Sequence, residues 1–145
     1  MFANAGVARF FIVLCLAFAP GTALAGSFKL VPIKLFFDVK AKSAVMRVIN
    51  KDQEKATLQL EAFKWTQDER GADQYAPTQD IVFFPKILTL EKNEEKIVRV
   101  GYQGGPEKNE RTYRLYLEEL PVSKPGEIAV KTVLRMGVPI FIEPI

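Results

Sequence analysis

The sequence contains no histidine and a single cysteine, Cys15. Catalytic triads that use histidine and the common zinc sites therefore lack their residues. Cys15 lies in an N-terminal apolar run, and without that run the chain has no thiol nucleophile and no disulfide. The carboxylate pairs Glu94-Glu95 and Glu118-Glu119 lie in a polar turn and in an expected strand, where neighbouring side chains point to opposite faces. We therefore expect no enzymatic activity, no catalytic residue, no metal and no cofactor.

Neither sign of charge is in large excess. The chain has 20 lysine and arginine residues against 17 aspartate and glutamate residues, a formal net charge of +3 at pH 7, and the two signs are interspersed. Domains that bind nucleic acid concentrate positive charge in a patch or stripe, and the sequence has no such stretch. We therefore expect no nucleic acid among the partners.

The first 25 residues have the features of an export signal. A lone arginine precedes the apolar run Phe10–Ala19, which is too short to span a membrane, and the stretch ends in an Ala-x-Ala pattern. This pattern predicts a signal peptide at residues 1–25, cleaved after Ala25, and one exported domain at residues 26–145. A lipoprotein anchor at Cys15 is the alternative, which the bulky residue before it disfavours.

Residues 26–145 alternate between apolar and polar side chains, as is typical of β-strands, and no segment has the apolar period of a helix. Pro32 interrupts the first segment, which predicts a strand that changes partner or sheet there. The segment Thr66–Gln79 has no apolar period and is expected to be a polar loop. Turn residues recur at the short intervals of a sandwich. The sequence therefore predicts an all-β sandwich of about seven strands, at Lys29–Phe37, Ala44–Asn50, Ala56–Trp65, Ile81–Phe84, Lys96–Tyr102, Arg111–Leu120 and Ile128–Ile142.

The last segment has the longest alternation. From Ile128 to Ile142 every even position except Thr132 is apolar, so an extended strand would carry a nearly continuous apolar row on one face. The odd positions include Pro139, which cannot donate a ladder hydrogen bond and favours an edge or a bulge. A long apolar edge strand either aggregates or serves a partner. Packing of the row into the domain's own core is the alternative, and both remain open at this point.

Several segments carry a likeness to a known family. They are Asn50 after a strand, Phe84-Pro85-x-Ile-Leu-Thr-Leu, a polar turn with Lys96-Ile-Val-Arg-Val, Arg111-Thr-Tyr-Arg-Leu-Tyr-Leu-Glu-Glu-Leu-Pro, and Val138-Pro-Ile-Phe-Ile-Glu-Pro. Their order and spacing resemble the N-terminal domain of the periplasmic pilus-assembly chaperones, the PapD-like family of chaperone-usher systems. The resemblance covers essentially all of residues 26–145. It implies an immunoglobulin-like seven-stranded β-sandwich in the periplasm, with pilus subunits and an outer-membrane usher as partners.

The resemblance also implies a binding mechanism, donor-strand complementation. Family members lend alternating apolar residues of the last strand of this domain to subunits whose own sandwich lacks a strand, which is a form of β-strand addition. By position, the lent residues here would be Val130, Thr132, Leu134 and Met136, with Val138 beyond them. Thr132 departs from the apolar pattern, which suggests one shallow or polar pocket in the subunit.

Family members further hold the subunit's C-terminal carboxylate with a basic pair. The first member matches Lys34, whereas the second falls on Pro139, which has no charge. Arg135, on the same face as Pro139, and Arg114, on a neighbouring strand, are candidates for the missing charge. A solvated surface role is the alternative for each.

Two expectations follow from the length of the chain. Family members have two domains and this sequence stops near their junction, so we expect a fragment or truncated product whose last strand can self-associate. The function predicted is that of a periplasmic chaperone for pilus or fimbrial subunits. The alternative is an exported immunoglobulin-like structural module of a surface or pilus assembly.

Overall fold

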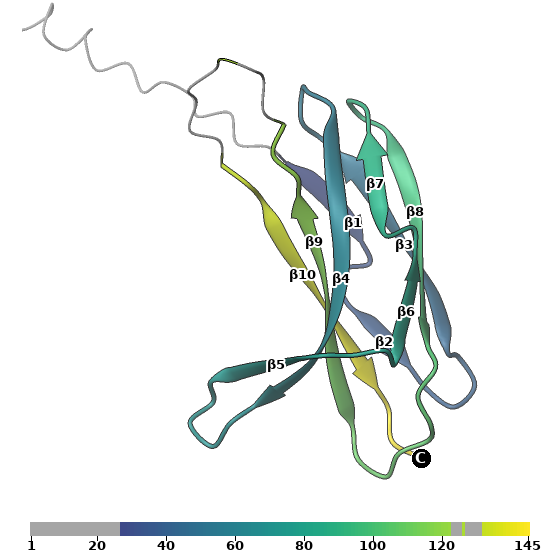
Figure 1. Ribbon diagram of the computed structural model, residues 1–145. Helices are drawn as coiled ribbons and strands as arrows, with labels where there is room; N and C mark the ends of the chain where they lie inside the picture. Colours follow the sequence, from purple (N-terminus) through teal and green to yellow (C-terminus); the bar gives the residue numbers. More distant parts are fainter. Residues whose placement is uncertain (1–26, 123–125, 127–131) are drawn as a thin grey trace, which may run out of the picture.

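Two β-sheets pack face to face in the part of the chain that the computed structural model describes, residues 27–122, 126 and 132–145 (Figure 1). One sheet has the strand order β1-β3-β8-β6, and the other has the order β2-β10-β9-β4-β5, with β7 also paired to β4. The all-β sandwich is thereby confirmed. The strands are β1 (Phe28–Val31), β2 (Leu35–Phe37), β3 (Ser43–Asn50), β4 (Ala56–Gln67), β5 (Asp73–Pro77), β6 (Ile81–Phe84), β7 (Ile87–Leu90), β8 (Glu95–Tyr102), β9 (Arg111–Glu119) and β10 (Arg135–Ile142).

The apolar alternation decides which face of each strand lies in the core. Met46 of β3 stands opposite Val98 of β8, and both side chains are fully buried. In the other sheet Leu60 of β4 stands opposite Leu117 of β9, with the same burial. Removal of these side chains from water is the main favourable term in the stability of the domain. The largest fully buried side chains are Tyr113, Phe37, Met46, Leu58, Leu90, Leu115, Leu117, Ile140, Val48, Val98, Val100 and Val138.

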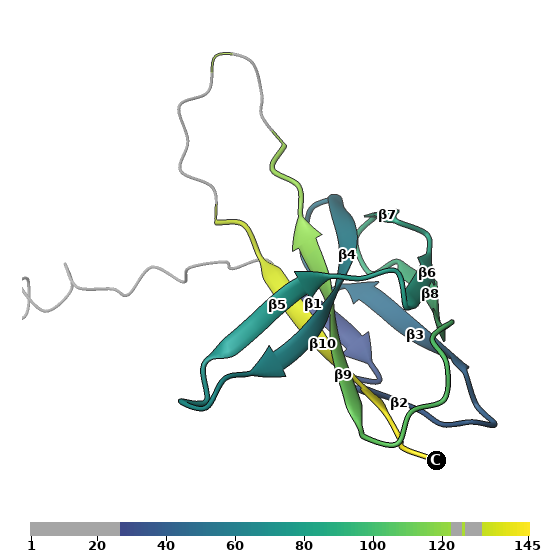
Figure 2. The same ribbon diagram turned by 60° about the horizontal axis from the view of Figure 1, so that its bottom comes forward.

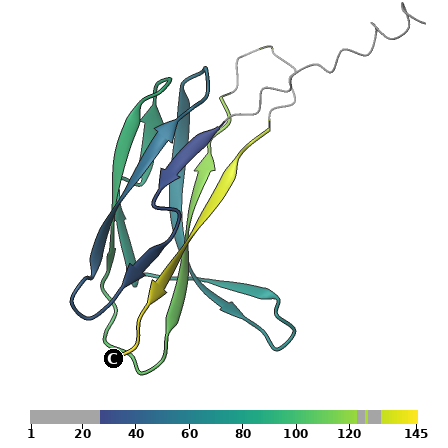
Figure 3. The same ribbon diagram turned by 180° about the vertical axis from the view of Figure 1, so that it is seen from behind.

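The first strand changes sheet at Pro32, as the sequence predicts. β1 pairs antiparallel with β3 in the four-stranded sheet, whereas β2 pairs parallel with β10 in the other sheet. β1 and β2 are edge strands of the two sheets, and seen from behind they follow one another along the same edge of the sandwich (Figure 3). Pro32 has no amide hydrogen to place in a ladder, so it lies naturally at the point where the chain leaves one sheet for the other.

The structure has more strands than the seven expected, and the expected polar loop at Thr66–Gln79 is wrong in part. β4 continues to Gln67 and turns back as β5, which forms a hairpin that projects from the sandwich (Figures 1 and 2). We call this hairpin, residues 63–77, the arm. All five residues of β5 are exposed, so neither face needs an apolar row and the strand leaves no period of two in the sequence. β7 and the division of the first strand account for the other additional strands.

The final strand is shorter than expected. β10 begins at Arg135, and the described residues 132–134 precede it without strand structure. The reason is that β9 ends at Glu119, where its amide donates a last hydrogen bond, of 2.9 Å, to the carbonyl of Leu134. Earlier residues have no partner strand within the described part of the chain. The expected start at Ile128 falls in residues 127–131, outside the described residues.

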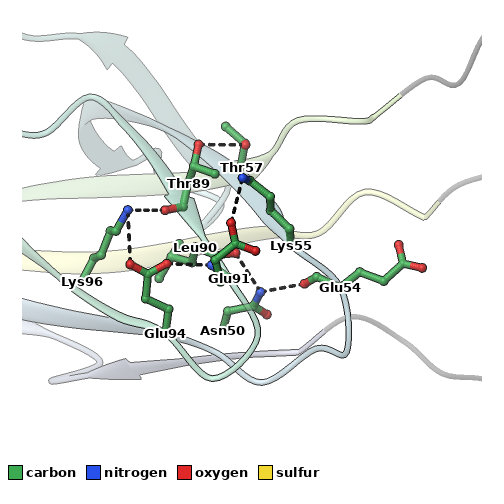
Figure 4. Close-up of polar contacts among 9 residues, drawn as sticks. All are labelled: Asn50, Glu54, Lys55, Thr57, Thr89, Leu90, Glu91, Glu94 and Lys96. Carbon is green, nitrogen blue, oxygen red and sulfur yellow. Dashed lines mark hydrogen bonds and ion pairs between the residues drawn. The ribbon is translucent and has the colours of Figure 1, made fainter.

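Asn50 connects two turns at one end of the sandwich (Figure 4). Its side chain is fully buried, and its Nδ2 donates to the carbonyl oxygens of Glu54, at 2.8 Å, and Leu90, at 3.2 Å. Its Oδ1 accepts from the amide of Asp52 at 2.9 Å. One amide side chain therefore satisfies three backbone groups that the two turns leave without a ladder partner.

Ion pairs surround this buried amide but are exposed. Lys55 lies 2.8 Å from Glu91, and Lys96 lies 3.5 Å from Glu94, with side chains 36% to 63% exposed. Pairs of this kind contribute less than about 1 kcal/mol each. The stability of the two turns therefore depends mainly on Asn50.

We predict that Asn50→Ala lowers the free energy of unfolding by about 2 kcal/mol, because it leaves buried backbone groups without hydrogen-bond partners. Chemical denaturation followed by circular dichroism measures the change. Lys51→Ala is the matched control, since Lys51 is an exposed neighbour in the same turn. Equal unfolding midpoints for the two variants would contradict the role assigned to Asn50.

Candidate functional site

The edge of β10 is paired along only part of one side. β10 pairs with β9 over its whole length, from Arg135 to Ile142, but with β2 only from Ile140 onwards. The preceding strand β1 belongs to the other sheet, so the side of β10 from Arg135 to Pro139 has no partner strand in the described part of the chain. An edge with free backbone groups is a site where another strand can add.

The apolar row of the last segment divides into two parts at this edge. Thr132 is exposed, and Leu134 and Met136 are half-buried, with Met136 packed against the core cluster. Val138 is only 1% exposed and continues into the core with the even residues that follow it. The side chain of Val138, the last residue of the expected lent row, thus packs in the core of this domain. Val130 lies outside the described residues.

A row of aromatic rings crosses the outer face of the six-stranded sheet. Lys34 lies over the ring of Phe36 with its Nζ 5.8 Å from the centroid, and Phe36 stacks on Phe141 at 5.2 Å. Phe141 in turn meets Trp65 edge to face, with 6.5 Å between the centroids. The guanidinium carbon of Arg114 lies 4.1 Å from the centroid of Trp65. Lys34 and Arg114 thus lie at opposite ends of this row and are not adjacent.

Arg114 stands directly opposite Pro139 across β9 and β10. The stem of its side chain passes close to Gly137 of β10, and its guanidinium packs over Trp65 and Tyr75, where Nη1 donates a hydrogen bond of 2.5 Å to the Tyr75 hydroxyl. Asp73 lies 3.6 Å from the same nitrogen. The structure therefore places the backbone of Arg114 opposite the uncharged Pro139, while residues of the arm hold its guanidinium.

Arg135 has a different environment. Its guanidinium carbon lies 4.0 Å from the centroid of Tyr116, and its Nε lies 3.2 Å from a carboxylate oxygen of Glu118. Both side chains are 50% exposed. The 3.2 Å between Arg135 and Glu118 is shorter than the 3.6 Å between Arg114 and Asp73, so Arg135 is more closely compensated and is a weaker candidate for an anion contact than Arg114.

The arm residues are the part of this site that the sequence did not point to. Trp65 and Phe63 occupy outward positions of an expected strand, so the alternation marks their face but gives them no role. Tyr75 and Asp73 lie in the segment expected to be a loop, where no pattern indicates a face. Their contact with Arg114 of β9 depends on the pairing of β5 with β4, which brings together segments that are far apart in the sequence.

Other surfaces of the described residues carry less chemistry. A shallow groove of about 480 Å³ lies beside β4 and β6, lined by Glu61, Ala62, Phe63, Pro77, Thr78, Gln79, Ile81, Val82, Phe83, Lys86 and Gln103. Within residues 27–122, 126 and 132–145, no cluster of acidic or other metal-binding side chains is placed to hold a metal ion. No helix in this part of the chain has the length and hydrophobicity needed to cross a membrane.

The fold and the partly unpaired last strand define an immunoglobulin-like domain with a strand edge that is open over part of its length. The family model described as "Pili and flagellar-assembly chaperone, PapD N-terminal domain" matches residues 27–145. The chain belongs to this family. The immunoglobulin-like fold and the resemblance seen in the sequence are thereby confirmed.

Solved structures of pilus chaperones have the same fold. A chain of the pre-assembly complex of the chaperone CsuC and the tip adhesion subunit CsuE, from the archaic chaperone-usher Csu pili of Acinetobacter baumannii, matches with a TM-score of 0.68 and 25% identity, over 81% of this chain and 52% of that chain. The class 5 fimbriae chaperone CfaA matches with a TM-score of 0.65 and 22% identity, over 81% of this chain and 56% of that chain. A chain of the complex of the SafB chaperone with the SafA pilin of Salmonella enterica matches with a TM-score of 0.64 and 16% identity, over 84% and 56% of the two chains.

The chain spans little more than half the length of these structural relatives. No curated protein is significantly similar in sequence. The family and its solved members are pilus chaperones and not enzymes, which agrees with the absence of catalysis expected from the composition. This homology supports a chaperone role for the chain.

We predict that Gly137→Ala displaces Arg114. A Cβ at position 137 would lie 2.9 Å from Cδ of Arg114 and 3.0 Å from a ring carbon of Tyr116, so the arginine stem, which packs over Trp65, must shift. The crowding should cost about 1 kcal/mol of unfolding free energy and change the fluorescence of Trp65. Gly105→Ala is the control, because a Cβ there meets no atom within 4 Å. An unchanged Trp65 emission in Gly137→Ala would contradict the contact.

Proposed function

We propose that the chain is the subunit-binding domain of a periplasmic pilus-assembly chaperone and binds pilus subunits by donor-strand complementation. The observation that carries the proposal is the side of β10 from Arg135 to Pro139 that has no partner strand among the described residues. A segment of the subunit that adds to this side gains main-chain hydrogen bonds, while side chains from the chaperone fill its groove.

We assign the lent side chains to Val130, Thr132, Leu134 and Met136, and end the row before the buried Val138. Leu134 and Met136 support this assignment, since both are half-buried and directly adjoin the unpaired edge. Thr132 is exposed and would enter a shallower or more polar pocket. Val130 is assigned on its place in the alternation alone.

The proposal includes partners and location beyond the described domain. Residues 1–25 direct export and are removed after Ala25, and residues 26–145 form the N-terminal chaperone domain. An outer-membrane usher receives the loaded complex. In the absence of a subunit, the unpaired side of β10 pairs with a second copy of the chain.

We predict that Leu134→Asp combined with Met136→Asp weakens binding to a strand-deficient pilus subunit about 100-fold, because each apolar side chain contributes about 1.5 kcal/mol of burial. Size-exclusion chromatography with light scattering and a binding titration measure the loss. Val133→Asp, on the opposite face of the same segment, is the control, since Val133 is 41% exposed. The single variant Leu134→Asp keeps the test independent of Met136, which contacts the core.

Unchanged binding by a folded double variant would exclude strand donation. The alternative function, an immunoglobulin-like structural module, then applies, and the chain should be a stable monomer that is indifferent to the subunit. The burial of Val138 and the even residues after it is the observation that favours this alternative.

We further propose that Arg114 holds the C-terminal carboxylate of the subunit and supplies the charge that Pro139 lacks. Lys34 lies at the other end of the aromatic row and is the alternative anchor. Arg135 stays the third candidate, because Glu118 neutralises it. Arg114→Gln should weaken binding of a subunit with a free carboxylate about tenfold, since it removes a charge-assisted contact, and Lys34→Ala should have this effect instead if Lys34 is the anchor. An amidated subunit is the control in the same titration. An equal loss for the amidated subunit would show that no contact with the carboxylate was removed.

A further inference from the structure

Arg114 is held in place by residues of the arm. Its Nη1 donates to the Tyr75 hydroxyl at 2.5 Å, and its guanidinium carbon lies 4.1 Å from the Trp65 centroid. The side chain is only 22% exposed, and its Nε is buried without a hydrogen-bond partner. A free arginine side chain loses about 2 kcal/mol of conformational entropy when it is fixed. The contacts with Tyr75 and Trp65 already fix the Arg114 side chain in the free domain, so it loses less conformational entropy when a ligand binds.

Asp73 orients both residues that hold Arg114. Its Oδ1 accepts hydrogen bonds from Trp65 Nε1 at 2.9 Å and from Gln67 Nε2 at 3.1 Å. Its Oδ2 accepts from the Tyr75 hydroxyl at 3.1 Å. These hydrogen bonds, first that of Trp65 and then that of Gln67, hold the pKa of Asp73 below its ordinary value, so the carboxylate is ionised at neutral pH.

The carboxylate of Asp73 does not take up the hydrogen-bond donors of the Arg114 guanidinium. The 3.6 Å between Asp73 Oδ2 and Arg114 Nη1 is longer than a hydrogen bond, so the two groups attract each other without direct donation. Within the described part of the chain, Arg114 Nη2 has no hydrogen-bond partner. The arginine is therefore fixed by stacking and by one hydroxyl, and it keeps donor capacity for a carboxylate from outside.

We propose that Asp73 is a positioning residue, which acts through Trp65 and Tyr75 to hold the Arg114 guanidinium ready for a carboxylate ligand. The inference rests on the proposed role of Arg114 as a carboxylate anchor. In this proposal the arm orients the guanidinium of Arg114, whose backbone lies opposite the uncharged Pro139.

Trp65, the only tryptophan in the chain, makes the site directly observable. The purified chain is titrated with N-acetyl-glycyl-phenylalanine and, separately, with the C-terminal amide of this peptide, and the emission of Trp65 is recorded. The ratio of the two affinities measures recognition of the carboxylate alone. General loss of packing affects both peptides and leaves the ratio unchanged.

Three variants and a control separate the possible roles. Asp73→Ala removes all three accepted hydrogen bonds and should lower the acid-to-amide affinity ratio about fivefold. Asp73→Asn keeps an oxygen for Trp65 and removes the negative charge, so its ratio should be at least that of the wild type. Tyr75→Phe deletes only the hydroxyl and should lower the ratio, even where Asp73→Ala is too unstable to measure. Gln74→Ala, on the other face of β5, should change nothing.

The outcomes distinguish this inference from the function on which it rests. A lowered ratio in Asp73→Ala with recovery in Asp73→Asn supports the positioning role. A wild-type ratio in both Asp73→Ala and Tyr75→Phe, together with a lowered ratio in Arg114→Gln, overturns the positioning role and leaves the anchor intact. A wild-type ratio in Arg114→Gln overturns the anchor and the positioning role together.

Discussion

The change of sheet at Pro32 is the constraint on which the arrangement of this domain depends. Because β1 pairs with β3 and only β2 returns to β10, the last strand is covered along just three residues of its outer side. The same strand therefore does two things. From Val138 onwards it closes the core, and before Pro139 it leaves a row of backbone groups unpaired. A first strand that stayed in the sheet of β10 would have covered the whole edge of β10. One that stayed in the sheet of β3 would have covered none of it.

The outer face of the six-stranded sheet is organised around the same edge. Its aromatic row begins at Phe36 on β2, crosses Phe141 on β10 and reaches Trp65 on β4, with a basic side chain at each end. Phe36 is exposed, Phe141 and Trp65 are half-buried, and the three rings contact one another beside a strand whose edge is only partly paired. The proposed subunit would meet a main-chain edge and an aromatic surface at once, and the arm determines the orientation of Arg114 on that surface.

Much of the sandwich can be predicted from the sequence, because the alternation of apolar and polar residues is a local property of strands with one buried face. Leu117 lies between Tyr116 and Glu118, and the period of two indicates its buried face. Met46 and Val98 each have one apolar neighbour, Val45 and Ile97, which the packing of the sheets leaves exposed. The arm is the main element that the sequence did not predict. Its β5 strand is exposed on both faces, so it has no alternation and was expected to be a loop. The sequence also does not separate Val138 from Met136, because both lie in the same alternation and only the position of the opposite sheet buries Val138 more than Met136.

For the candidate site, composition and local pattern were enough to exclude the common forms of catalysis, to indicate an all-β domain and to mark an apolar row on the last strand. Proline at position 32 was enough to indicate a break in the first strand. Which side of β10 stays unpaired, and which arginine stands beside Pro139, depends on contacts between segments far apart in the chain. Register across β9 and β10 sets Arg114 opposite Pro139, and the fold of the arm turns its side chain toward Trp65. These are properties of strand order and packing, and a pattern of neighbouring residues carries no information about either.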